Sequence, residues 1–204
     1  MIVIIDNNPL NWDGEFLLPS VLERSFKEEF RVVHYTSADL EDVVLSSDVE
    51  AVISGGSPCL ITDPDTRVSF EGEIDLLRRV DKPLLGICHG HQLLALSFGG
   101  EVAMRDFRVE GYKDIEILVE DPIFEGLNGR FKAWKMHREE VSDIPKNFVL
   151  LARSRECGVE AIRHEDYPLY GLQFHPEKFN SENPAGLRIL QNFIDIVCGD
   201  SRNL

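Results

Sequence analysis

Residues 84–100 read LLGICHGHQLLALSFGG, an apolar run that stops at a cysteine and continues in a helical pattern. The part at 86–90, GICHG, has the spacing G-x-C-x-G, in which flanking glycines permit a sharp, strained turn between a strand and a helix. Such a turn holds the side chain of Cys88 above the sheet, near the first turn of the helix, whose positive end favours a thiolate. The backbone N–H of His89 would then point to where an oxyanion forms. The stretch therefore predicts that Cys88 is a nucleophile.

Two other roles for Cys88 compete with this one. A cysteine at the end of a buried strand is often only a small apolar thiol, but the glycines on both sides and the helix that follows favour a nucleophile. A metal site would combine Cys88 with His89 and His91. Adjacent helical residues diverge by about 100°, however, and cannot all face one ion. We therefore expect no metal site.

The chain around this turn alternates between strand and helix patterns. Apolar runs typical of buried parallel strands occupy 1–6, 31–36, 51–55 and 83–87. Helical spacing of apolar residues separates them, at 19–30, 38–46 and 70–80. This order predicts an α/β fold with a doubly wound, mostly parallel central sheet and flanking helices on both faces.

The pattern changes after Gly100, where strand signals follow one another closely. They lie at 113–120, 130–135, 148–154, 158–164 and 169–174. Because no Gly-, Ser- or Pro-rich linker precedes them, we expect additional, largely antiparallel strands in the C-terminal half of a single domain, residues 1–204. A last helix is expected from about Asn183, with Gly199 just beyond its end.

The charge balance restricts the partners. The 204 residues include 36 acidic and 21 basic side chains, a formal charge of −15, which would repel nucleic acid and anionic membranes. No stretch resembles a signal peptide or reaches the length of a membrane span, which predicts a cytoplasmic protein. The four cysteines form no C-x-x-C pair and no phosphate-binding glycine loop is present, so no cofactor is expected.

A thiolate nucleophile needs a base, and the segment LYGLQFHPE at 169–177 supplies a candidate. In an extended stretch, residues two apart point the same way, and Pro176 disfavours a helical conformation at His175. The carboxylate of Glu177 can therefore lie beside the imidazole of His175, set its tautomer and stabilise its protonated form.

Together these residues resemble a known family. GICHGHQ at 86–92, QFHPE at 173–177 and SGGSP at 54–58 are similar to the three signatures of class I (triad) glutamine amidotransferases. The resemblance extends over nearly the whole chain and implies a flavodoxin-like class I amidotransferase fold. It also implies an enzyme that hydrolyses the side-chain amide of L-glutamine through a thioester, with the ammonia used by a partner domain or subunit.

The resemblance assigns roles in catalysis. Cys88 would be the nucleophile, His175 the general base and acid, and Glu177 the orienting carboxylate of a Cys-His-Glu triad. Gly56 would contribute to the oxyanion hole opposite the backbone N–H of His89.

The resemblance also places residues around the substrate. Gln92 would bind glutamine, and Met136 and His137 would occupy the position whose backbone holds the α-amino and α-carboxylate groups. His137 and the pair Glu139 and Glu140 would lie where a synthetase makes contact.

Within the family, the nearest likeness is to the separate amidotransferase subunits of two-subunit, archaeal-type GMP synthetases. Four stretches carry it: IIDN at 4–7, EGY at 110–112, MHREEV at 136–141 and CGVEA at 157–161. It implies that a separate ATP-pyrophosphatase synthetase subunit is the partner and that XMP is the acceptor. The chain departs from the family pattern at Met136, where serine is usual. An amidotransferase with another acceptor, a stand-alone γ-glutamyl amide or peptide hydrolase, and a non-catalytic regulatory module therefore stay open as alternatives.

Two predictions concern the partner. The loops 56–69 and 134–141 are expected to be exposed, polar and mobile, so that docking could reorder the site. A group of basic residues is expected either to meet an acidic partner surface or to form a solvated strand face: Arg130, Lys132, Lys135 and Arg138.

Overall fold

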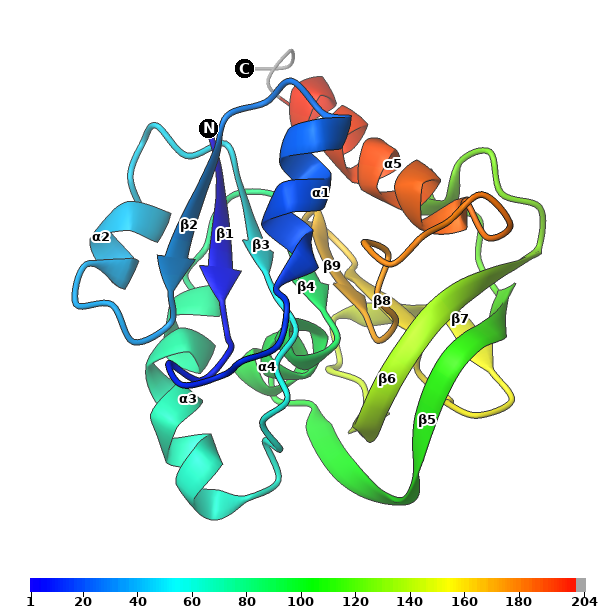
Figure 1. Cartoon of the computed structure of the whole chain (residues 1–204), viewed down its shortest axis with the longest axis horizontal. Helices are drawn as coiled ribbons and strands as arrows, with labels where there is room; N and C mark the ends of the chain where they lie inside the picture. The colour runs from blue at the N-terminus through cyan, green and yellow to red at the C-terminus, as the bar shows by residue number, and fades with distance from the viewer. Residues whose placement is uncertain (201–204) are drawn as a thin grey trace.

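The structure is a computed structural model that describes residues 1–200. A nine-stranded sheet runs through it in the order β2-β1-β3-β4-β9-β8-β7-β5-β6, and its first five strands are parallel. These are β2 (Phe30–His34), β1 (Ile2–Asp6), β3 (Ala51–Ser54), β4 (Leu84–Ile87) and β9 (Leu169–Leu172). In Figure 1, β1 to β4 lie on the left and the long strands β5 and β6 on the right, with β9 between them.

Within residues 1–200, five α-helices accompany the sheet: α1 (Leu17–Ser25), α2 (Leu40–Val44), α3 (Pro64–Leu77), α4 (His89–Ser97) and α5 (Ala185–Asp200). They cover both faces, because side chains along a strand alternate between two apolar cores. Ile2 and Ile4 of β1 pack in one core with α1 and α5. Val3 and Ile5 pack in the other with α2, α3 and α4. The predicted doubly wound arrangement is thus confirmed.

The remaining strands pair antiparallel with their neighbours, and β8 also pairs antiparallel with β9. They are β5 (Glu101–Ile117), β6 (Arg130–Asp143), β7 (Phe148–Ser154) and β8 (Ala161–His164), and a short 3₁₀ helix (Pro122–Phe124) lies in the β5–β6 connection. The segment 169–174, expected among the additional antiparallel strands, instead contains β9, which completes the parallel half beside β4. β5 and β6 form a long ribbon, paired from Glu101 with Asp143 to Glu116 with Arg130. Within residues 1–200, no helix is long and apolar enough to cross a membrane.

The ribbon corrects three expectations. β5 begins at Glu101 rather than near 113, and 134–141 belongs to β6, so the prediction of an exposed loop there is wrong. Lys135 is completely buried, which excludes it from a solvated face or a partner contact. The two strands pair at a dozen positions, and this pairing stabilises strand structure in stretches whose polar residues gave no strand signal. At the other end of the chain, α5 continues through Gly199, which is not a terminal cap.

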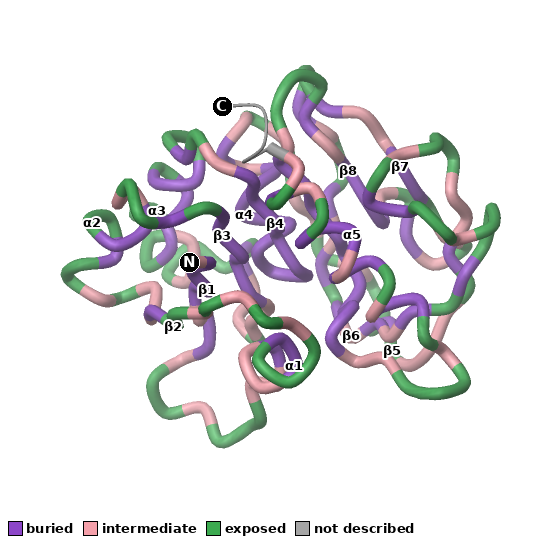
Figure 2. The backbone as a smooth tube through the Cα atoms, turned by 90° about the horizontal axis from the view of Figure 1, so that it is seen from above, coloured by how far each residue is buried: buried purple, intermediate pink, exposed green. Residues whose placement is uncertain are grey.

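The segment 56–69 is also more ordered than predicted. α3 begins at Pro64, and Asp63 caps it by accepting a 2.9 Å hydrogen bond from the backbone N–H of Thr66. Part of the expected loop is therefore helix. Figure 2 shows that the region the site depends on, β3, β4 and α4, is buried almost throughout.

Candidate active site

Cys88 occupies a strained turn between β4 and α4. Its backbone has φ 53° and ψ −100°, and it is the one non-glycine residue within 1–200 with positive φ. A Cβ at Gly86 would lie 2.5 Å from the carbonyl oxygen of Gly90, and a Cβ at Gly90 would lie 2.2 Å from that of Ser54. Both glycines are thus required by close backbone approach, as expected for a nucleophile elbow. The strain is of the kind that surrounding structure must hold in place.

His175 and Glu177 form a buried pair after β9. The ring Nδ1 of His175 donates a 2.7 Å hydrogen bond to Oε1 of Glu177. The backbone N–H of His175 donates to the carbonyl of Trp134 on β6 at 2.8 Å, which ties the turn to the antiparallel ribbon. Burial opposes charge on the imidazole, but Glu177 and Cys88 outweigh it and raise the pKa of His175 to about 10. The ring of His175 therefore favours its protonated form at neutral pH.

Gly56, the third predicted element of the site, lies beside both Cys88 and His175. A Cβ built at Gly56 would lie 3.1 Å from Cε1 of His175 and 3.7 Å from Cβ of Cys88. The sulfur of Cys88 is 3.7 Å from Nε2 of Gln173 and 3.8 Å from the carbonyl oxygen of Met136. Chain segments that follow β3, β4 and β9 thus converge, because the carboxyl ends of parallel strands share one edge of a sheet.

The predicted substrate residues Gln92 and His137 are joined by hydrogen bonds to the carbonyl of one β6 residue. The side-chain amide of Gln92 donates to the carbonyl of Glu139 at 3.0 Å and to Oε1 of Gln173 at 3.2 Å. Nδ1 of His137 donates to the same Glu139 carbonyl at 2.8 Å. Burial, with a contribution from the charge of Lys135, lowers the pKa of His137 to about 4. His137 is therefore neutral, and its Nε2 is left as an acceptor.

A cavity of about 780 Å³ brings these groups together. All the residues predicted for the site line it: Gly56, Cys88, His89, Gln92, Met136, His137, His175 and Glu177. Other lining residues were not predicted from the sequence, among them Trp12, Phe16, Arg108, Arg138 and Lys178. They come from the loop before α1 and from β5, β6 and the turn after β9. Arg138 and Lys178 lie within or next to motifs, but nothing in the sequence indicates that the side chains from these separate segments meet here.

His89 and His91 do not join Cys88 at the cavity through their rings. The ring of His89 packs against Phe70 with centroids 4.6 Å apart, and His91 fills the space above Gly171, where a Cβ would lie 2.3 Å from Nδ1 of His91. Burial lowers the pKa of both histidines to about 3. Both are core side chains in this structure.

Glu139 is also internal, contrary to the expected role in contacting a synthetase. Its carboxylate is buried and accepts hydrogen bonds of 2.8 Å from the backbone N–H groups of Ile61 and Thr62. Glu140 pairs with Arg105. Glu139 therefore anchors the segment that follows Gly56 to β6.

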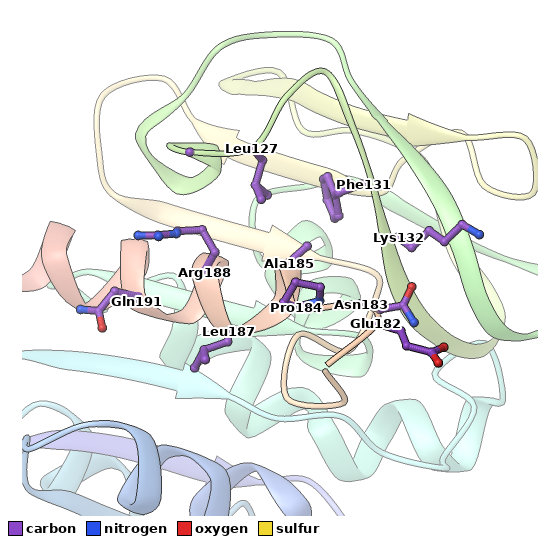
Figure 3. Close-up of a pocket in the computed structure, with 11 residues that line it drawn as sticks. Leu127, Phe131, Lys132, Glu182, Asn183, Pro184, Ala185, Leu187, Arg188 and Gln191 are labelled. Atoms are coloured by element: carbon purple, nitrogen blue, oxygen red, sulfur yellow. The ribbon is translucent and has the colours of Figure 1, made fainter. Parts of the chain in front are cut away.

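A second cavity of about 610 Å³ lies near the start of α5 and contains none of the predicted site residues. It is lined by residues within the ranges 126–132 and 182–191. Figure 3 shows the charged ends of Lys132 and Arg188 pointing in opposite directions. These cations do not converge on one ligand position. The candidate active site is therefore the cavity that contains Cys88, His175 and Glu177.

A nucleophile elbow on a doubly wound sheet, with a histidine–carboxylate pair at the next strand, defines a class of thiol enzymes that act on acyl groups or amides. A sequence model of the family Glutamine amidotransferase class-I matches residues 19–197. The chain belongs to the class I glutamine amidotransferases.

Relatives and solved structures agree with this membership. The chain is 38% identical over 202 residues to the glutamine-hydrolysing GMP synthase subunit of Pyrococcus abyssi, covering 98% of this chain and 100% of that one. It is 38% identical to the protein of the same name from Methanopyrus kandleri, with the same coverage. A Thermoplasma acidophilum crystal structure provisionally assigned to a GMP synthase subunit superimposes with a TM-score of 0.83 at 26% identity, over 99% of this chain and 95% of that one. A glutamine amidotransferase from Thermotoga maritima, 16% identical over 96% of each chain, shares the fold with a TM-score of 0.75.

Proposed function

We propose that this chain hydrolyses the side-chain amide of L-glutamine through a thioester on Cys88 and supplies the ammonia to a separate ATP-dependent synthetase that converts XMP to GMP. The observation that carries the chemistry is the convergence of Cys88, His175 and Gly56 at one cavity. Relatives named as the glutamine-hydrolysing subunit of GMP synthase, matched over their full length, support the choice of acceptor.

In the first half-reaction, Cys88 would act as a thiolate beside a protonated His175. The Cys88 thiolate attacks the side-chain carbonyl carbon of glutamine, a C–S bond forms, and the carbonyl oxygen becomes an oxyanion that the backbone N–H groups of His89 and Gly56 would stabilise. His175 then gives its proton to the departing nitrogen, the C–N bond breaks, and ammonia leaves. Glu177 supports the charged ring throughout.

The second half-reaction releases the Cys88 thiolate and leaves His175 protonated again. Neutral His175 accepts a proton from water, the hydroxide attacks the thioester carbonyl, and the C–S bond breaks to release glutamate. Gln92, Met136 and His137 would form the wall against which the substrate's α-amino and α-carboxylate groups lie. The Nε2 acceptor of neutral His137 suits an ammonium group rather than a carboxylate.

Coupling to a partner is tested by measuring glutaminase activity of the chain alone and with the ATP-pyrophosphatase subunit of a GMP synthetase, ATP and XMP. We expect slow hydrolysis alone and at least about tenfold acceleration in the complete mixture, because docking can complete the transition-state geometry. Full activity alone, unchanged by the partner, would favour a stand-alone hydrolase. No activity in either case would favour a regulatory module.

A further inference from the structure

A buried carboxyl group lies behind the segment that carries Gly56. Glu73, in the middle of α3, is 2% exposed. Its Oε1 accepts a 2.7 Å hydrogen bond from the hydroxyl of Ser54 and a 3.3 Å bond from the side-chain amide of Asn7. The Asn7 amide also donates to the Ser54 hydroxyl at 3.0 Å and to the Gly55 carbonyl at 3.1 Å. The end of β3 is therefore held from behind by a buried polar cluster.

This cluster connects directly to the reactive groups. The backbone N–H of Gly90, in the first turn of α4, donates to the carbonyl of Gly55 at 3.1 Å. The next residue, Gly56, lies against Cys88 and His175. A shift of Ser54 or Gly55 would therefore move Gly56 relative to the sulfur, and oxyanion stabilisation depends on donor positions within a few tenths of an ångström.

We propose that Glu73 is a positioning residue, whose carboxyl group holds Ser54 and Asn7 so that the backbone N–H of Gly56 faces the oxyanion of the reaction. This inference rests on the proposed glutaminase function. Glu73 itself touches neither substrate nor the reacting atoms; it acts through the backbone of the segment 54–56.

The role requires hydrogen-bond acceptance rather than charge. Burial raises the pKa of Glu73 to about 7, although the bonds from Ser54 and Asn7 oppose the shift. Both of those donors reach Oε1, whereas Oε2 has no hydrogen-bond partner within residues 1–200. A proton on Oε2 leaves both bonds intact. Glutamine, which presents a carbonyl oxygen in the same place, should therefore replace Glu73.

The test compares three variants of the full chain, assayed for glutamine hydrolysis with the synthetase, ATP and XMP present. Glu73→Ala should lower kcat about 10- to 100-fold with little change in KM, because the lost contact matters in the transition state. Glu73→Gln should stay within about twofold of the wild type. Ser54→Ala, which removes one of the two donors, should lower kcat by a smaller factor than Glu73→Ala and gives a milder variant should that one fold poorly.

Two controls separate positioning from general damage. Ile74→Ala removes a buried side chain from the same helix without touching the polar cluster, and it should lower the melting temperature while leaving kcat near the wild-type value. The rate at which iodoacetamide alkylates Cys88 should be unchanged in Glu73→Ala, since alkylation forms no oxyanion.

Wild-type kcat in Glu73→Ala, or a loss in Glu73→Gln as large as in Glu73→Ala, would overturn the inference. An equal loss of hydrolysis and alkylation would also overturn it, because the elbow itself would then be disturbed. A wild-type chain that hydrolyses no glutamine would instead refute the proposed function.

Discussion

The parallel and antiparallel halves of the sheet contribute to the site in different ways. The parallel half presents side chains and an N–H-bearing turn at strand ends: Gly56 after β3, Cys88 after β4 and His175 after β9. The antiparallel half contributes backbone as well as side chains, since the carbonyls of Trp134 and Met136 on β6 meet His175 and Cys88, and His137 lines the cavity. The reactive groups thus lie where parallel strands end. The β5–β6 ribbon contacts these ends and helps to hold them in place.

A buried ion pair connects the β5–β6 ribbon to the segment before β8. Lys135 of β6 and Glu160, just before β8, are both fully buried and form a salt bridge, and the ammonium group also donates to the hydroxyl of Ser154 at 3.0 Å. Burial raises the pKa of Glu160 and that of its neighbour Cys157. Such a pair adds little net stability compared with apolar packing, but removal of one partner leaves an uncompensated charge. Removal of either charge is therefore expected to destabilise the antiparallel half.

The largest expected effect is on the nucleophile of the parallel half. Cys88→Ser should lower glutamine hydrolysis by at least about 10⁴-fold while leaving the melting temperature nearly unchanged, because the hydroxyl is a far weaker nucleophile in the same geometry. Peptide mapping after treatment with a glutamine-like chloroketone should place the label on Cys88. A label on Cys59 or Cys157, with Cys88 unmodified, would refute the assignment.

Substitution of the base, His175, should lower kcat more than substitution of its orienting carboxylate, Glu177. His175→Ala should lower kcat by roughly 10³- to 10⁴-fold, since proton transfer has no substitute. Glu177→Gln should lower it by about 10- to 100-fold, because the amide can still hold the ring but cannot support its charge. Initial rates at saturating glutamine measure both. Small and equal losses would mean that the turn after β9 is only structural.

Substitutions in the buried Lys135–Glu160 pair should affect the stability of the antiparallel half rather than the chemistry of the parallel half. Lys135→Met should lower the free energy of unfolding by about 3–5 kcal/mol, since Glu160 is left buried without its partner. The double variant Lys135→Met with Glu160→Leu should recover most of this loss. Urea denaturation curves measure both, and a single variant as stable as the wild type would show that the pair does not brace the ribbon.

The smallest expected effect is a pH dependence of the free energy of unfolding that comes from the buried His89. Burial holds the pKa of His89 near 3, although its ordinary value is 6.5, so the unfolded chain binds a proton in this range that the folded chain does not. The stability associated with neutral His89 is present above pH 6.5 and is lost as the pH falls toward 3. Relative to His89→Leu, the wild type should lose about 2 kcal/mol of unfolding free energy between pH 7 and pH 5. A difference between the two proteins that does not change with pH would mean that His89 titrates normally.

Sequence-based prediction was most successful where the determinant is local. Glycines at 86 and 90 define the elbow because each lacks the Cβ that would collide with backbone, and this requirement is visible within five residues. The turn at His175 and Glu177 is equally local, and the observed 2.7 Å bond joins residues two apart. The alternation of apolar strands and helices likewise depends on short periods in the chain. These features led to the correct fold class and to the candidate triad.

Other parts of the site depended on residues far apart in the chain. Glu73, Asn7 and Ser54 carry no common motif, and only the packing of α3 behind β1 and β3 brings them together. From the sequence, Lys135 is expected on a partner surface or a solvated strand face, and Glu139 at a synthetase contact in an exposed loop. Both are buried, because their partners come from segments that the sequence separates by 25 and about 78 residues.

The sequence by itself thus determined the elbow, the base turn and the alternation of strands and helices in the first half of the chain, since backbone sterics and side-chain periodicity act over a few residues. Only the tertiary structure decided which polar groups are buried and what they hold in place. A charged or polar side chain is stable inside the protein only if distant segments supply its hydrogen-bond partners, and those segments become neighbours only when the sheet is assembled.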